Sequence, residues 1–236
     1  MINKVENMTK AIVYRKREGI VNIKGESLPE YIRPEEVERI IHAVEVELNA
    51  KTTPERQKQT KRHLLAIQTL WMTGIRVSEL VQLRSMDIME GGLRVFGKRK
   101  PRTKEEIERG IVHEKRQRIV PIPVVLRQKL INYVFDEKLG SEQRLFPFTT
   151  TRVYQFIDFY AKKAGIQRKI YPHMFRHGFA VHFLETTHSL NALQQVLGHS
   201  NLQSTTIYTK LTNEEIQRYM DMTFSNKKVY YEGYGR

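Results

Sequence analysis

Two histidines and an arginine lie close together in the segment PHMFRHGFAVHF. His173 and Arg176 are three residues apart, so on a helix they share a face and can converge on one anion. His173 and His177 are four residues apart, a spacing that can also hold zinc. A metalloprotease would need a glutamate directly after the first histidine, where Met174 stands instead. An arginine on the same face would also repel a cation, so the segment favours an anion site or a plain solvated helix.

The segment MTGIRVSEL holds a second candidate. Gly74 is predicted to end one helix, and Arg76 falls in the turn before the next. An arginine beside the first backbone amides of a helix is well placed to hold a phosphate. Arg76 could equally form an ordinary surface ion pair with Glu79, three residues further on. This segment alone does not decide between the two.

The segment VFGKRK puts Lys98 at the tip of a predicted strand, where a flexible amine can reach a neighbouring group. Together with Arg99 and Lys100, this lysine could instead contact only a DNA backbone.

The segment LGHSNLQSTTIYTKL has few apolar residues and does not look like core. Gly198 is a natural helix end, so His199 is expected at a helix junction. Tyr208 follows nine positions later. A phenol has an ordinary pKa near 10, so it becomes a nucleophile at neutral pH only if its neighbours favour ionisation. A working role for Tyr208 therefore depends on what the rest of the chain brings to it.

The composition predicts a polyanionic partner. Lys and Arg number 40 against 26 Asp and Glu, a formal net charge of +14, and nucleic acid is the commonest polyanion. The chain has no cysteine, which excludes disulfides, thiolate nucleophiles and Cys-ligated zinc. No segment approaches the roughly 18 apolar residues of a membrane span. We therefore expect a soluble cytoplasmic protein with no membrane partner.

The elements that must position these residues are predicted to be mostly helical. Residues 1–28 indicate a basic arm without a separate domain, residues 29–225 one domain, and residues 226–236 a flexible tail. Helices are expected at 33–48, 62–72, 76–83, 124–138, 150–164, 173–185, 189–197, around Tyr208 and at 213–224, with a charged linker at 49–61. Alternating residues predict strands at 92–97 and 117–123. The expected fold class is mainly α with a small antiparallel β-sheet.

A long polar insertion, residues 98–115, separates the two predicted strands. It contains Thr103 and Glu106 at the spacing of a capping box, so we expect a short helix inside the hairpin.

Taken in order, these segments resemble a known family. TGIRVSEL, GK before the strand that ends in RIVPIP, HMFRH, LGHS and IYTKL are similar to the motifs of tyrosine recombinases, also called phage integrases. The resemblance covers roughly residues 30 to 225. It implies the DNA breaking-rejoining fold, with a catalytic domain over residues 29–225. It also implies a site-specific recombinase, active in DNA recombination and integration of mobile genetic elements, that needs no metal or other cofactor.

The resemblance also implies roles for the candidate residues. Arg76 and Arg176 would clamp the non-bridging oxygens of a phosphodiester and stabilise its transition state. His199 would donate a further hydrogen bond. Tyr208 would attack the phosphorus, giving a 3′-phosphotyrosine and a free 5′-hydroxyl.

Three further residues would assist. His173 is the candidate base for the tyrosine, Lys98 would protonate the leaving oxygen, and Glu79 would orient the arginine site. The hairpin insertion is longer than is usual in the family, so three other lysines compete with Lys98 for its role: Lys100, Lys104 and Lys115.

Double-stranded DNA is the implied partner, and a homo-tetramer is expected in the synapse. The helix at 213–224 carries an apolar stripe made of Ile216, Tyr219, Met220 and Phe224. In the family such a helix docks into the next subunit, although it could also pack on its own domain. Family members usually carry a separate core-binding domain, for which residues 1–28 leave no room. We therefore expect weak stand-alone DNA binding, partly supported by the arm. Delivery of Tyr208 to its own or to a neighbouring subunit stays open.

Three other functions compete with this interpretation. A type IB-like topoisomerase would use the same chemistry without exchanging DNA partners. A catalytically idle DNA-binding regulator could keep the fold, but every catalytic position is filled. A zinc hydrolase built on His173 and His177 lacks a third ligand and the glutamate.

Overall fold

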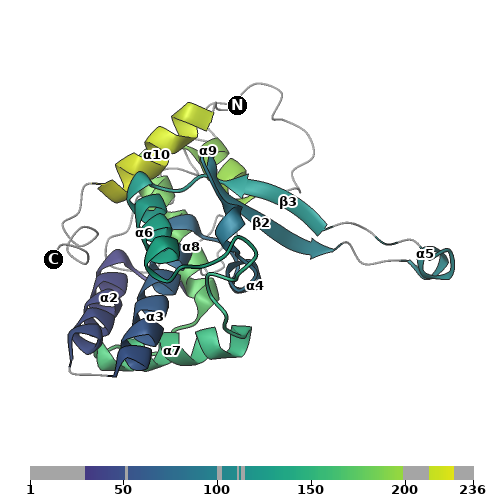
Figure 1. Ribbon diagram of the computed structural model, residues 1–236. Coiled ribbons are helices and arrows are strands. Elements are labelled where there is room, and N and C mark those ends of the chain that lie inside the picture. Colours follow the sequence, from purple (N-terminus) through teal and green to yellow (C-terminus); the bar gives the residue numbers. More distant parts are fainter. Residues whose placement is uncertain are drawn as a thin grey trace.

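The computed structural model describes residues 30–50, 53–99, 103–110, 112, 115–198 and 213–225. The helices pack together, and a small sheet lies at one side of them (Figure 1). The helices are α2 (Pro34–Asn49), α3 (Pro54–Thr73), α4 (Val77–Leu80), α5 (Lys104–Glu108), α6 (Val124–Asp136), α7 (Thr150–Lys163), α8 (Pro172–Thr187), α9 (Leu190–Leu197) and α10 (Asn213–Ser225), with a 3₁₀ turn at Ser85–Asp87. The mainly α fold with a small antiparallel sheet is confirmed.

Helices α2 and α3 pack against each other along their length. The predicted apolar stripe of α2 is buried through Val37, Ile40, Ile41 and Val44. The prediction of a linker at 49–61 is wrong from residue 54 onward, because α3 already begins at Pro54. Proline is favoured in the first turn of a helix, and the glutamate, arginine, glutamine and lysine residues that follow it are good helix formers. Two of these lysines also form ion pairs with the end of α6: Lys58 with Glu137 and Lys61 with Asp136.

The sheet has three antiparallel strands in the order β1 (Ile88–Met89), β2 (Gly92–Arg99) and β3 (Lys115–Val120). Both predicted strands are present, and β1 is an addition that the sequence prediction missed. Leu93 pairs with Val120, and Val95 pairs with Arg118. Residues that pair across antiparallel strands share a face, so Arg118 lies on the same face as these buried apolar residues. The register shifts between Phe96 and Arg99, which is a β-bulge.

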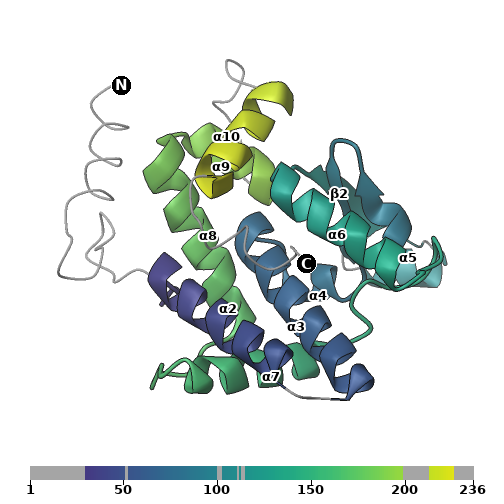
Figure 2. The ribbon, with the colours of Figure 1, turned by 60° about the vertical axis from the view of Figure 1, so that its left-hand side comes forward.

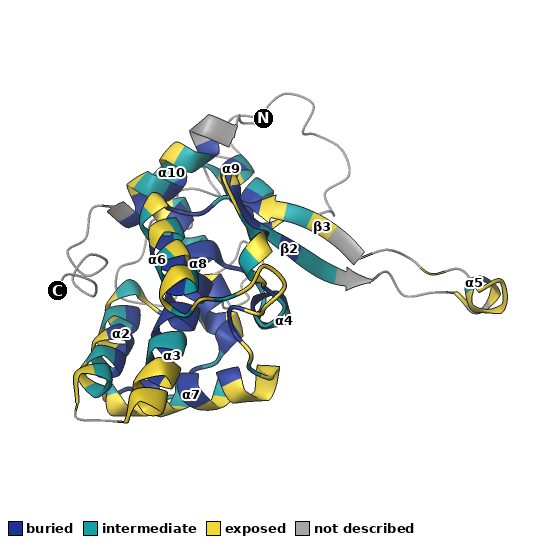
Figure 3. Cartoon of the chain, viewed as in Figure 1, coloured by how far each residue is buried: buried dark blue, intermediate teal, exposed yellow. Residues whose placement is uncertain are grey.

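Helix α5 lies in the insertion between β2 and β3 and projects away from the other helices (Figure 1). The predicted capping box is present. Thr103 Oγ1 accepts a hydrogen bond from the Glu106 amide at 3.2 Å, and the Glu106 carboxylate accepts one from the Thr103 amide at 2.8 Å. Most of the side chains described here are exposed (Figure 3).

Helix α8 lies among α3, α7, α9 and α10 (Figure 2). Its buried face includes Phe175, Phe179 and Phe183. Gly178 allows a close approach, because a Cβ there would collide with the backbone oxygen of Ile32 and a ring carbon of Trp71. The segment before α2 and the Trp71 ring of α3 therefore pack closely on α8, the helix that carries His173 and Arg176.

Helix α10 buries Ile216, Met220 and Phe224 of the predicted stripe, while Tyr219 is half-buried. Phe224 stacks on Phe179 with ring centroids 6.0 Å apart and meets Trp71 edge-on at 6.3 Å. The stripe thus contributes to this chain's own core.

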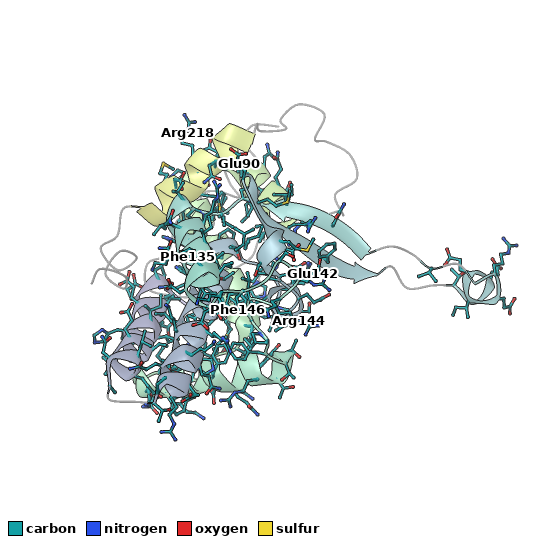
Figure 4. All side chains as sticks on the ribbon, viewed as in Figure 1. Glu90, Phe135, Glu142, Arg144, Phe146 and Arg218 are labelled. Carbon is teal, nitrogen blue, oxygen red and sulfur yellow. The ribbon has the colours of Figure 1, made fainter. Side chains whose placement is uncertain are left out.

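Exposed apolar side chains gather beside α6, where Met89, Ile131 and Phe135 line one pocket. Phe135, labelled on α6 in Figure 4, is 83% exposed. None of the helices in the described ranges is long and apolar enough to cross a membrane.

Candidate active site

Arg76 sits where α3 stops and α4 begins. Gly74 ends α3 in the left-handed conformation, with φ of 60°, as the sequence predicted. A Cβ at this position would lie 2.5 Å from Cδ1 of Phe179, so a side chain is excluded by both conformation and space. Arg76 is the N-cap residue of α4, and its side chain is 42% exposed. The tight turn thus places a partly exposed arginine beside the first turn of α4.

Glu79 is the buried carboxylate beneath Arg76, with a side chain only 1% exposed. It accepts hydrogen bonds from the backbone amide of Arg76 at 2.8 Å and from Nη1 of Arg76 at 3.3 Å. It also accepts two from Arg118 on β3, at 2.7 and 3.1 Å. Burial by itself raises the pKa of Glu79, but these hydrogen bonds and the two guanidinium charges outweigh burial and lower the pKa. Glu79 is therefore ionised at neutral pH.

Arg176 reaches the same region from α8 and is 9% exposed. Its Nη1 donates to the carbonyl of Gly74 at 2.6 Å, and its Nη2 donates to the carbonyl of Leu197 at 3.2 Å. Burial lowers the pKa of Arg176 to about 10, and the neighbouring charges of Arg76 and Arg118 act in the same direction. Arg176 still carries its proton at neutral pH. It ties the end of α3 to the end of α9.

His173 and His177 lie on the first turns of α8, and both are exposed. Burial lowers the pKa of His177, and the charges of His173 and Arg176 lower it further. In the described part of the chain, no group of three or more His, Cys, Asp or Glu residues is arranged to hold a metal ion.

The remaining candidates are placed only in part. Lys98 belongs to β2, next to the bulge. Lys104 is the first residue of α5 and Lys115 the first of β3. Lys100 lies outside the described residues.

His199 and Tyr208 also lie outside the described residues. Gly198, which precedes His199, ends α9 with φ of 67°, as predicted for a helix end.

Arg118 is a site residue that the sequence analysis missed. A signal for it was present, because Arg118 precedes the buried Val120 by two residues and Ile122 by four. A period of two puts all three on one face of the strand. An arginine on an inward face requires a buried anionic partner, and Glu79 is that partner.

The structure thus brings three guanidinium groups, those of Arg76, Arg118 and Arg176, around one carboxylate. The positive charge exceeds the negative, and Arg76, with a side chain 42% exposed, is the most accessible of the three. Guanidinium groups match the oxygens of a phosphate in shape and charge. The arrangement can bind a phosphate-like anion at the surface and stabilise charge that develops on it.

Comparisons with known proteins identify the family of the chain. The chain is 30% identical to a tyrosine recombinase of Pseudothermotoga lettingae over 84% of its length, covering 62% of that relative. It is 31% identical to tyrosine recombinase XerA of Thermococcus kodakarensis over 81% of its length, again covering 62% of the relative. The crystal structure of XerA recombinase matches 93% of this chain and 68% of its own with a TM-score of 0.53 at 24% identity, a likeness of fold. The sequence model of the phage integrase family matches residues 30–215. The chain therefore spans about three fifths of the length of these curated relatives, and it belongs to the phage integrase family.

Proposed function

We propose that this chain is a site-specific DNA recombinase that cleaves and rejoins DNA strands through a covalent tyrosine intermediate. The observation that supports the proposal is the arginine cluster: Arg76 is paired with Glu79 at the start of α4, and Arg176 joins the end of α3 to the turn that precedes His199. Both curated relatives described above are named tyrosine recombinases, which supports the same chemistry here.

The two arginines have complementary tasks in this proposal. Arg76 is accessible and contacts a non-bridging oxygen of the scissile phosphate directly. Arg176 is more buried, and its positive charge acts across a region of reduced water content, where electrostatic stabilisation is stronger. Together they offset the charge that grows on phosphorus oxygens as the nucleophile attacks. Removal of one such donor typically costs about 10²- to 10³-fold in rate.

Tyr208 is the proposed nucleophile, and His173 is the proposed base that accepts its proton. The phenolate oxygen forms a bond to phosphorus, and the bond to the 5′ oxygen breaks, which leaves a 3′-phosphotyrosine. Lys98 donates a proton to the leaving 5′ oxygen, and His199 donates a hydrogen bond to the phosphate. The 5′-hydroxyl of another strand then attacks the phosphotyrosine and regenerates Tyr208. The exchange needs no metal or nucleotide, because the phosphodiester energy is kept in the covalent bond.

The partners follow from the same proposal. Double-stranded DNA is the substrate, and the basic arm at residues 1–28 adds phosphate contacts. Four copies assemble in the synapse, with α10 released from its own core to dock on a neighbour. The protein acts in the cytoplasm, where its DNA lies.

Covalent trapping tests the proposal. The protein is incubated with fragmented DNA of its own replicon, denatured, and examined for protein–DNA adducts, with Tyr208→Phe as the control. We expect adducts from the wild type alone, and sequencing of their DNA identifies the target site. DNA binding without adducts from either protein would contradict the proposal and favour an idle binder. If the protein forms adducts and relaxes supercoiled DNA but yields no recombinant products, a topoisomerase would be favoured.

A further inference from the structure

The carboxylate of Glu79 is saturated with donors. A carboxylate offers about four acceptor positions, and four donors are present here. Oε1 accepts from Arg118 Nη1 at 2.7 Å and from Arg76 Nη1 at 3.3 Å. Oε2 accepts from Arg118 Nη2 at 3.1 Å and from the Arg76 amide at 2.8 Å. Arg118 alone fills two positions with a parallel fork, the strongest form of this contact.

The fork of Arg118 limits how Arg76 can use the same carboxylate. The Arg76 guanidinium touches Glu79 through one nitrogen, at the longest of the four distances. Its side chain stays 42% exposed, while that of Arg118 is 21% exposed. If Arg118 were absent, a carboxylate that is 99% buried would lose two donors, which is costly. Arg76 is already in contact and could satisfy both empty positions by turning inward.

Arg118 also lies against the turn that leads to His199. A Cβ on Gly198 would be 2.5 Å from Cδ of Arg118 and 2.7 Å from its Nε, so the two residues are in close contact. Arg176 holds the preceding residue through the carbonyl of Leu197. The turn at Leu197–Gly198 is therefore supported by two arginines from different elements.

We propose that Arg118 is a positioning residue of the strand-transfer reaction: by saturating Glu79 it keeps the Arg76 guanidinium turned outward and available to the scissile phosphate. This inference rests on the function proposed above and deepens it. Arg118 directs one N–H of Nη1 and one N–H of Nη2 at Glu79, so in this proposal it acts on the carboxylate and not on the phosphate. Its effect on the reaction passes through Arg76.

A double-mutant cycle tests the inference. Arg118→Gln, Glu79→Gln and the double variant are compared in single-turnover adduct formation on the DNA recovered by trapping, at saturating protein. We expect Arg118→Gln to slow adduct formation roughly 10²-fold, the usual effect of losing one transition-state donor. When Glu79 is already replaced by Gln, Arg118→Gln should slow adduct formation by less than about a further threefold, because a neutral amide no longer draws Arg76 inward. Arg118→Lys should recover part of the rate.

Arg94→Gln is the matched control. Arg94 lies on β2, and its Nε donates to the buried carboxylate of Asp87 at 2.9 Å, so this variant also breaks an ion pair in the same sheet. Both variants should lose similar stability in urea unfolding, but only Arg118→Gln should slow adduct formation. The inference would be overturned if Arg94→Gln and Arg118→Gln slowed adduct formation equally. It would also be overturned if Arg118→Gln slowed the reaction as much in the Glu79→Gln variant as in the wild type.

A crystal structure of Arg118→Gln gives a readout that needs no activity. We expect both Nη atoms of Arg76 within hydrogen-bond distance of the Glu79 carboxylate. An Arg76 side chain that keeps its single contact would overturn the inference. If the wild type itself forms no adduct on any DNA, the proposed function fails, while this comparison still decides the role of Arg118 in positioning Arg76.

Discussion

Gly74 connects the fold to the candidate site, and replacing it with alanine should destabilise both. At φ of 60°, the left-handed conformation costs an alanine about 1–2 kcal/mol of folding free energy. Its Cβ would also lie 2.5 Å from Cδ1 and 3.0 Å from Cγ of Phe179, an overpacking that typically costs about 1–3 kcal/mol. We therefore expect Gly74→Ala to lower the free energy of unfolding by about 2–5 kcal/mol.

Gly165→Ala separates the two contributions. Gly165 also has a left-handed backbone, with φ of 73°, but a Cβ there would meet no atom within 4 Å. This variant should lose only the conformational part, about 1–2 kcal/mol. Urea unfolding followed by circular dichroism measures both variants, and equal m-values would show that the same transition is compared. If Gly74→Ala lost no more stability than Gly165→Ala, the close packing of this turn on α8 would be refuted.

Three other predictions concern the core and the carboxylate. Burial, with a smaller contribution from the charge of Arg152, lowers the pKa of His63 from 6.5 to about 4. Between pH 6.5 and 4 the unfolded chain therefore binds a proton at His63 that the folded chain does not bind. The free energy of unfolding should fall by up to about 3 kcal/mol over this range. In pH-dependent melting curves, His63→Phe should make this fall smaller. Phe224→Ala should lower the free energy of unfolding by about 3–5 kcal/mol and shift the fluorescence of the single tryptophan, Trp71. Met222→Ala, at an exposed position of α10, should change neither. Glu79→Ala should cost about 3–5 kcal/mol in urea unfolding, because a partly buried guanidinium loses its counter-charge, and a loss below about 1 kcal/mol would contradict the pairing described here.

The sequence predicted those parts of the fold that depend on local pattern. The apolar stripes of α2 and α10, the glycine ends of α3 and α9, and the capping box of α5 all depend on residues a few positions apart, and all are present. The start of α3 was missed because its first two turns, PERQKQTK, are polar and carry no apolar stripe. Their stabilisation comes partly from ion pairs with α6, about 75 residues further along the chain.

The candidate site was predictable to the extent that its residues lie in recognisable segments. Arg76 and Glu79 form an ion pair in the structure, and the charges of both act on Arg176, while the roles that the resemblance implies for them stay proposals. Local spacing places Arg118 on the inward face of its strand, but it does not identify Glu79 as the partner, because Glu79 lies 39 residues earlier in the chain. Only the pairing of β2 with β3, and the packing of that hairpin on α4, brings the two together.

The most direct test of the central claim is the identity of the residue that becomes attached to DNA. Adducts trapped on the recovered target site would be digested with protease and nuclease, and the modified peptide sequenced by mass spectrometry. We predict a single modified peptide in which Tyr208 carries a nucleotide through its 3′ phosphate, with a free 5′-hydroxyl on the other DNA end. Attachment at any other residue, or through a 5′ phosphate, would contradict the mechanism.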